Sequence, residues 1–465
     1  MPALTLLLAG WTALAPAGQF QRIGHTELPL QSHDKGMYGA AIDPVNGYAY
    51  FVGSYIFKLD ITENLPVQVG PAVSSGQTID CAIDSTAGYL YLQKGGVINR
   101  YAVGAGAAAV TSAGSLSPPG AALNGFSMVI DDSDPNPANH YGYLMSSGTP
   151  ATVMKIALSS FSVVSSLTLN AGENSFGFGQ IDTRHGYAYF TTWSTYLNPV
   201  IPRVIKIKLT PGTNPPIRIG IVNMDTIPQA LWPDAIDTVH GYLYSGTDNG
   251  STNPETVYKV QLGAGDAAPT LVGAVQLHAG EFQLTSAVVD PAGGYAYFAD
   301  DNTYPGRIYQ FLLNGPDPPV ELGYLQLQGG ASTPPPNGTS GSNITTDGSP
   351  LPYGEVYLRS AVYDPVRGYV YFGQDSRPNQ VVKVQLARDV PSITSTAVQS
   401  GGTFQVKFSH TPYVTSTAWM STDLTLPFAN WTSLGATTEV TPGQYQFTDP
   451  QAGNDARRFY FISSP

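Results

Sequence analysis

The sequence has little cysteine, little charge and no long apolar run in its interior, and each shortage excludes a class of protein. Its 465 residues contain one cysteine, Cys81, so neither an intrachain disulfide nor a cluster of thiolate metal ligands can form. Charged residues make up 12% of the chain and the net charge is −12. Binding to nucleic acids or anionic membranes requires clustered Lys and Arg, so we expect neither. Nothing after the first residues is long and apolar enough to span a bilayer.

The local sequence signatures of catalysis are also missing. The chain has no G-x-S-x-G, no H-E-x-x-H, no Walker loop and no G-x-G-x-x-G that opens a helix. The histidines are scattered and none has an evident partner. A site assembled from residues far apart in the sequence would leave no such signature, so catalysis stays an alternative. For Cys81, in the apolar run IDCAID, we expect a buried small residue rather than a nucleophile.

Glycine, proline and tyrosine are abundant instead, with 50, 38 and 28 residues. Gly and Pro interrupt regular structure, and aromatic residues suit a pleated surface, so this composition favours many short strands. At the N-terminus, an apolar stretch from Ala3 to Leu14 precedes the small-x-small sequence Ala15-Pro16-Ala17. We therefore predict an export signal over residues 1–17, and a secreted or cell-surface location, although the usual basic residues are missing from its start.

One motif occurs seven times along the chain. Small and apolar residues lead to an Asp, a short turn and then Gly-Tyr-x-Tyr, as in AIDPVNGYAY (41–50). In the third copy, an insertion separates Asp131 from Gly142, and the sequence continues as Gly-Tyr-Leu-Met. The spacing of successive motif glycines runs from 41 residues (47 to 88) to 74 residues (294 to 368). Periods near 40–50 residues are typical of propeller blades and solenoid turns.

Each copy continues with a variable loop and two further short strands. The first alternates a lysine with apolar residues, as in VIKIKL (204–209) and VVKVQL (381–386), which predicts a half-exposed strand. The second is similar to LVGAVQL (271–277). Four strands of period two in each copy predict an all-β fold, a seven-bladed β-propeller. We place the small residues before each Asp on the innermost strand, where the axis is crowded.

The seventh copy lacks its fourth strand, but a matching strand precedes the first copy at FQRIGHTELPL (20–30). We therefore predict that an N-terminal strand closes the ring by pairing with residues 381–386. Closure in this way leaves no exposed sheet edge that would invite aggregation. The predicted propeller domain covers residues 18–388.

The residues that recur in every copy have a structural explanation, because a single active site needs no seven copies of its residues. An Asp at a strand end accepts hydrogen bonds from turn amides, Gly permits a positive φ, and Tyr gives flat contact area between blades. The predicted structural residues are Asp43, Asp84, Asp131, Asp182, Asp237, Asp290, Asp364, Tyr48, Tyr89, Tyr143, Tyr187, Tyr242, Tyr295 and Tyr369.

These seven Asp-turn-Gly-Tyr units and their following strands resemble the bacterial surface-layer and YVTN-type propellers, and the broader group with WD40 and NHL rings. The resemblance covers roughly residues 20–388 and lies in the form of the repeat. The YVTN tetrapeptide and the Gly-His…Trp-Asp signature are both missing. The resemblance therefore implies the fold, and it transfers no function or site residue.

After Val390 the repeat stops and short strands of another kind follow, such as FQVKFSH (404–410) and RRFYFISS (457–464). We predict a small C-terminal β-sandwich of the Ig or fibronectin type over residues 391–465. Its ending resembles a terminal module common in exported proteins of environmental bacteria, through Asn430-Trp431-Thr432, Gln446-Phe447-Thr448-Asp449 and Arg458-Phe459-Tyr460. Residues 328–354 form a low-complexity insertion, for which we expect a loop over one face.

Function is expected at the loops before the innermost strands and after Gly-Tyr-x-Tyr, which share one face and vary most. Trp and Tyr beside carboxylates suit stacking on sugar rings, whose hydroxyls need acceptors. Plugging of the loops by these aromatic residues is the structural alternative. The candidate ligand-binding residues are Tyr38, Trp193, Tyr196, Trp232, Asp234, Asp248, Glu281, Asp300, Asp301 and Arg359.

No metal site or cofactor is predicted, although Ca²⁺ could bind oxygen ligands at residues 131–139 or between Asp248 and Glu255. Catalytic residues are not assigned. The preferred hypothesis is an exported, non-enzymatic protein that binds an extracellular protein or polysaccharide. A polysaccharide lyase or glycoside hydrolase acting at the channel mouth is the first alternative. A self-associating structural subunit of an extracellular layer or filament is the second.

Overall fold

The computed structural model describes residues 20–29, 36–76, 78, 80–118, 128–146, 148–174, 177–192, 201–225, 230–248, 254–281, 283–301, 303, 305–329, 354–375, 379–387 and 391–463. The predicted export signal, most of the insertion at 328–354, and the candidates Trp193 and Tyr196 lie outside these ranges. No helix among the described residues is long and apolar enough to cross a membrane.

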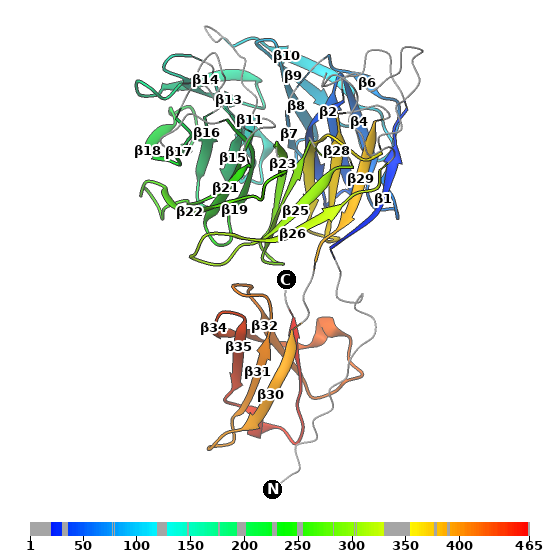
Figure 1. Cartoon of the computed structure of the whole chain (residues 1–465), viewed down its shortest axis with the longest axis vertical. Coiled ribbons are helices and arrows are strands. Elements are labelled where there is room, and N and C mark those ends of the chain that lie inside the picture. The colour runs from blue at the N-terminus through cyan, green and yellow to red at the C-terminus, as the bar shows by residue number, and fades with distance from the viewer. Residues whose placement is uncertain are drawn as a thin grey trace.

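The described residues form seven propeller sheets, and in each the first strand of the sequence motif lies at one edge. Figure 1 shows these sheets arranged around a common centre. Blade 1 contains β2 (Met37–Asp43), β3 (Tyr48–Gly53) and β4 (Tyr55–Asp60), with the short β5 (Val67–Gln68) and β6 (Val73–Ser74) both paired to β4. Blade 2 contains β7 (Cys81–Asp84), β8 (Tyr89–Lys94), β9 (Val97–Ala102) and β10 (Thr111–Leu116). Blade 3 contains β11 (Met128–Asp131), the 3-10 turn η1 (Pro137–Asn139), β12 (Tyr141–Met145), β13 (Thr152–Ala157) and β14 (Ser162–Thr168).

The other blades repeat this order. Blade 4 contains β15 (Gly179–Asp182), β16 (Tyr187–Thr191), β17 (Arg203–Lys208) and β18 (Ile217–Asn223). Blade 5 contains β19 (Leu231–Asp237), β20 (Tyr242–Thr247), β21 (Thr256–Gln261) and β22 (Thr270–Gln276). Blade 6 contains β23 (Leu284–Asp290), β24 (Tyr295–Asp300), β25 (Arg307–Leu312) and β26 (Val320–Gln326). Blade 7 contains β27 (Leu358–Asp364), β28 (Tyr369–Gln374), β29 (Gln380–Gln385) and, from the chain start, β1 (Gln21–Glu27).

The predicted ring closure is confirmed. Strand β1 pairs antiparallel with β29, with Gln21 opposite Gln385 and Glu27 opposite Gln380. The innermost strands contact one another in sequence around the axis, and the last of them, β27, contacts the first, β2. The ring therefore closes both at its inner wall and through the N-terminal strand.

The Asp-turn-Gly units act as predicted at the strand ends. In the first copy, the Asp43 carboxylate accepts from the Asn46 amide at 3.1 Å, and Gly47 has φ of +78°. The third copy differs from the prediction, because Tyr141 and not Tyr143 lies opposite Asp131. His140 thus occupies the place of the turn glycine, and its buried ring contacts the Asp84 carboxylate at 2.7 Å. Gly142 lies two residues further on, within β12.

The prediction of half-exposed lysine strands is wrong, because these lysines are buried between blades. Lys206 in blade 4 is 0% exposed, and its ammonium donates to the carbonyl oxygens of Leu262, Gly263, Gly265 and Ala267, in blade 5, at 2.6–3.0 Å. It also lies 4.1 Å from the centre of the Tyr187 ring. The same arrangement of ammonium, carbonyl oxygens and motif tyrosine occurs at Lys58, Lys155, Lys259 and Lys383.

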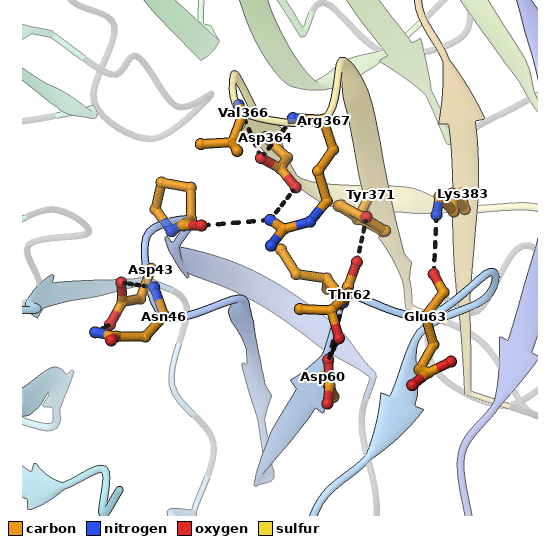
Figure 2. Close-up of polar contacts among 12 residues, drawn as sticks. Asp43, Asn46, Asp60, Thr62, Glu63, Asp364, Val366, Arg367, Tyr371 and Lys383 are labelled. Carbon is orange, nitrogen blue, oxygen red and sulfur yellow. Dashed lines mark hydrogen bonds and ion pairs between the residues drawn. The ribbon is translucent and has the colours of Figure 1, made fainter. Parts of the chain in front are cut away.

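Both tyrosines of Gly-Tyr-x-Tyr contact the next blade, as was predicted for the first, which also lies beneath the lysine. The Tyr187 hydroxyl of blade 4, for example, donates to Asp266 of blade 5 at 2.7 Å. The second tyrosine lies opposite the lysine in the strand pair, as Tyr371 does with Lys383. Figure 2 shows this seam between blades 7 and 1, where Lys383 reaches the carbonyl oxygen of Glu63 at 3.2 Å. The Tyr371 hydroxyl donates to the carbonyl oxygen of Ile61. Blade 7 is therefore held to blade 1 by the same contacts that join neighbours elsewhere in the ring.

The C-terminal residues form two further sheets, which Figure 1 shows below the ring. One contains β30 (Ser392–Val398), β31 (Phe404–Ser409), β35 (Gln444–Asp449) and β34 (Thr438–Thr441), and the other β33 (Thr432–Ala436), β32 (Thr417–Ser421) and β36 (Phe459–Ser463). The 3-10 turn η3 (Ala452–Asn454) lies between β35 and β36 and so connects the two sheets, whereas η2 (Phe428–Asn430) lies between β32 and β33 of one sheet. Buried residues of both sheets form one cluster, with Phe408 stacked on Tyr445.

This part of the chain packs against the Asp-turn-Gly side of blades 5 and 6. A Cβ on Gly294 would lie 2.9 Å from Thr411, and one on Gly315 would overlap the Tyr413 ring. A cavity of about 530 Å³ between the two parts is lined by His240 and Glu439, among others. The opposite face, where the variable loops lie, is the one on which function was predicted.

Because the Lys206 ammonium is buried and that of Lys208 is not, we expect their substitution to lower the free energy of unfolding by different amounts. Lys206→Met leaves buried carbonyl oxygens without a donor and should lower the free energy of unfolding by about 3 kcal/mol. Lys208→Met is the matched control, because Lys208 is 40% exposed and pairs with the exposed Asp266. We expect that change to cost less than about 0.5 kcal/mol. Urea denaturation of both variants measures the difference, and equal losses would contradict the proposed role of Lys206.

Candidate functional site at the mouth of the central channel

The propeller encloses a channel whose cavity measures about 370 Å³ and is lined by the first strands of all seven blades. Most of its wall consists of small and apolar residues, as the crowded axis requires. Cys81 lies on this wall, half-buried, and burial raises the pKa of its thiol. That shift disfavours the thiolate, so Cys81 is a poor nucleophile.

The second residue of an inner strand places a variable side chain at the end of this wall. Tyr38 stands there in blade 1, Trp232 in blade 5, Thr285 in blade 6 and Arg359 in blade 7. Trp232 is half-buried and packs edge-on against Phe178 of blade 4, with ring centres 5.3 Å apart. The Trp232 ring is therefore held in place by packing and is still partly accessible to solvent.

Three neighbouring blades bring an Asp to this mouth from the same position of the repeat. Asp248, Asp301 and Asp375 each lie six residues after the first motif tyrosine, in blades 5, 6 and 7. The sequence predicted Asp248 and Asp301 as candidate residues but not Asp375. The signal was available, since aligning the three copies on Gly-Tyr-x-Tyr superimposes the three aspartates. We call Asp248, Asp301 and Asp375 the acidic arc.

Arg359 lies among these carboxylates and forms an ion pair with Asp301. Its Nε lies 3.6 Å from Asp375 Oδ2, and its guanidinium carbon lies 5.6 Å from the centre of the Tyr38 ring. The charges of Asp301 and Asp375 raise the pKa of Arg359 although its burial acts in the opposite direction. Arg359 is therefore the charge that holds the acidic arc together.

Burial raises the pKa of Asp301 to about 6, although Arg359 opposes this shift, and the charge of Asp248 adds to it. The pKa of Tyr38 is also raised, by burial first and then by the charge of Asp375 and a hydrogen bond with it. The acidic arc therefore brings three carboxyl groups to a single guanidinium, which suits a ligand that offers hydroxyl or other donor groups.

Three other candidates have structural partners. Asp234 accepts a hydrogen bond from Thr191 at 2.6 Å, across the junction of blades 4 and 5, and burial raises its pKa to about 7. The Asp300 carboxylate accepts from Thr303 and Tyr309 inside blade 6. Glu281 lies beside Glu321 of the outer strand β26, away from the residues that line the channel. The structure thus gathers Tyr38, Asp248, Asp301 and Arg359 at the channel mouth. Trp232 and Asp234 line the channel cavity together with Tyr38 and Arg359, whereas Asp300 and Glu281 do not line it.

The loop at residues 131–139, where Ca²⁺ was named as an alternative to a solvated acidic turn, is held by its own side chains. Asp134 accepts from the Asn136 amide and from Asn139, and Asp131 accepts from Ser133. These hydrogen bonds explain the conformation of the loop without an ion. The second stretch, from Asp248 to Glu255, lies partly outside the described residues.

Comparison with known proteins shows the fold alone. No family model and no curated protein matches the chain. Among solved structures, one described as "Structure of U3-55K" matches with a TM-score of 0.54 and 10% identity, over 79% of this chain and 100% of that one. A second, "Crystal structure of RRP9 WD40 repeats", matches with a TM-score of 0.53, also at 10% identity, over the same shares. The propeller part of the chain thus has a seven-bladed, WD40-like fold.

The geometry of Arg359 predicts a pH-dependent effect on stability. Arg359→Met leaves Asp301 and Asp375 without their cation and should cost about 3 kcal/mol of unfolding free energy at pH 7.5. The folded-state pKa of Asp301 lies above its unfolded value, so this carboxyl stabilises the fold at low pH and loses that effect as the pH rises through about 6. Without Arg359 this pKa rises further, and the loss at pH 5 should be smaller.

Urea denaturation at pH 5.0 and pH 7.5 measures the loss caused by Arg359→Met. The exposed turn residue Arg184 supplies the control, since Arg184→Met removes the same charge without touching a buried carboxylate. An equal loss for Arg359→Met at the two pH values would show that the acidic arc does not depend on this arginine.

Proposed function

We propose that this protein is an exported, non-enzymatic binding protein that holds a neutral, hydroxyl-rich polysaccharide at the mouth of the propeller channel. The observation that carries the proposal is the half-buried Trp232 ring, which lines the channel cavity together with Arg359, the partner of Asp301. An aromatic face packs on the apolar CH face of a sugar, and carboxylates accept hydrogen bonds from its hydroxyls. The excess negative charge disfavours uronates and other anionic polymers.

Several features support binding rather than turnover. Arg359 occupies the space between Asp301 and Asp375, so neither carboxylate is placed as an independent acid or base. The described histidines pair elsewhere, as His140 does with Asp84 and His25 with Glu355. A glycoside hydrolase or lyase is the alternative, and one observation favours it: the pKa of Asp301, raised to about 6, would suit a general acid.

Assembly into an extracellular layer or filament is the second alternative. The outer strand β26 exposes three large apolar side chains on one face, Val320, Leu322 and Tyr324, and each is more than two-fifths exposed. Apolar residues that alternate on an outer strand can support contact between copies. A protein that elutes as a monomer from size-exclusion columns at all concentrations would argue against this alternative.

The extracellular location that we propose rests on the segments outside the channel mouth. Residues 1–17 would direct export and residues 18–388 would bind. The two C-terminal sheets would act as an Ig- or fibronectin-like accessory sandwich over residues 391–465, as in exported bacterial proteins. The resemblance of the repeat to surface-layer and YVTN-type propellers supports this setting.

Affinity electrophoresis and product assays on a panel of neutral polysaccharides test the proposal. We expect retardation by at least one polymer without release of reducing ends or unsaturated products. Trp232→Ala should weaken binding about tenfold, equivalent to ~1.4 kcal/mol. Trp431→Ala, in the C-terminal sheets, should leave it unchanged. Product release would favour the enzymatic alternative, and binding that Trp232→Ala does not affect would place the site elsewhere.

A further inference from the structure

A buried glutamate occupies the same position in the segments that precede blades 4, 6 and 7. The segments LNAGE (169–173) and LHAGE (277–281) share their pattern, and Glu355 stands in the corresponding segment before blade 7. Each glutamate accepts a hydrogen bond from a backbone amide at the start of its segment. These bonds run from Asn170 to Glu173 at 2.9 Å, from His278 to Glu281 at 2.6 Å and from Gln328 to Glu355 at 3.1 Å.

In blades 4 and 7 an arginine of the outermost strand neutralises this glutamate. Arg218 Nε donates to both carboxylate oxygens of Glu173 at 2.9 Å, and Arg22 Nε donates to both oxygens of Glu355 at 2.7 Å. The two glutamate side chains are 3% and 1% exposed. Each arginine is the second residue of its strand, two before a glycine at a β-bulge. The ion pair thus occupies the same position of the repeat in blades 4 and 7.

Blade 6 has a glutamate where the arginine is expected. Glu321 is the second residue of β26, two before Gly323, and the same bulge follows it. Its side chain is 6% exposed and that of Glu281 is 7% exposed, so two buried carboxylates replace an ion pair. Glu321 Oε2 is fully buried, and no backbone amide, lysine or arginine among the described residues donates to it. The burial of Glu321 and the charge of Glu281 raise the pKa of Glu321.

One further group faces these carboxylates, the ring of His278. Its Nδ1 lies 3.3 Å from Glu321 Oε2 and 3.5 Å from Glu281 Oε2. A single ring nitrogen has at most one proton to donate, so it cannot satisfy both oxygens. Since the His278 side chain is 80% exposed, the cluster is open to solvent on that side.

We propose that His278, Glu281 and Glu321 bind a divalent transition-metal ion of the Zn²⁺ type. Their ligand atoms all lie within 4.8 Å of one another, so small side-chain adjustments bring each to the roughly 2.0–2.2 Å that zinc requires. A nitrogen and two carboxylates match zinc better than Ca²⁺, which takes six to eight oxygens, roughly, and no imidazole. The exposed side leaves a fourth position for water.

The ion takes the place of the missing guanidinium. It neutralises the same buried glutamate and joins the segment that enters blade 6 to the outer strand of that blade. The site is therefore structural, and it is separate from the channel mouth, so it does not depend on the proposed function.

Titration calorimetry of the full chain with ZnCl₂, after treatment with EDTA and dialysis, tests the proposal. We expect one site in the natural protein and its loss in Glu321→Arg, which restores the pairing of blades 4 and 7. Because that variant regains an ion pair, its melting temperature in EDTA should equal or exceed that of the natural protein. If Glu321→Arg fails to fold, His278→Ala supplies the comparison, and it should bind Zn²⁺ at least tenfold more weakly.

A transplant gives the converse test. Asn170→His combined with Arg218→Glu reproduces the cluster of blade 6 in blade 4, and the stoichiometry should rise from one to two. His410→Ala, in the C-terminal part, is the control for binding by unrelated histidines and should change nothing. The proposal is overturned if the natural protein binds no Zn²⁺, or if Glu321→Arg binds it with unchanged affinity and stoichiometry.

Discussion

The structure depends on a buried cation at the junctions between blades. An ammonium taken out of water is stable only if its N–H groups find acceptors, and the turn of the next blade supplies carbonyl oxygens for this purpose. The first motif tyrosine lies beneath the cation, at 3.9 Å for Lys383. The cost of burial is still visible at Lys259, whose pKa falls to about 8. Each blade therefore fixes the turn of its neighbour, which sets the angle between successive sheets.

Two blades have a residue other than lysine at the position of the buried cation. In blade 2 the cation is Arg100, which lies over the Tyr89 ring and donates to the carbonyl oxygen of Leu158 in blade 3. In blade 6 the neutral Gln310 occupies this position, and among the described residues its amide donates to the hydroxyl of Tyr297 in its own blade at 3.5 Å. Blade 6 also lacks the arginine of the outer ion pair. The blade that has lost both repeated cations is the one that we propose to hold a metal ion.

One face of the ring stabilises the fold, and the other holds the candidate site. The Asp-turn-Gly side repeats the same bonds and supports the C-terminal sheets. The other side holds loops that differ between blades, and there Arg359 gathers three aspartates. The three aspartates occupy one position of the repeat, and only blades 5, 6 and 7 have an aspartate there. The site is therefore charged on one side of the ring, although the framework repeats seven times. Variation at fixed positions, rather than insertion of new elements, accounts for both the channel mouth and the proposed metal site.

The sequence by itself determined the number of blades, the strand order and the closure by β1, because hydrophobic alternation and turn residues act locally and repeat visibly. It also located Tyr38, Trp232 and Arg359 as variable residues of the loop face. It could not show that the lysines are buried, since a lysine between apolar residues has the same pattern whether its partner is water or a neighbouring blade. Nor could it bring Asp375 to Asp301, or Glu321 to His278. Those contacts join residues 43 to 74 positions apart, and only the packing of one blade on the next decides them.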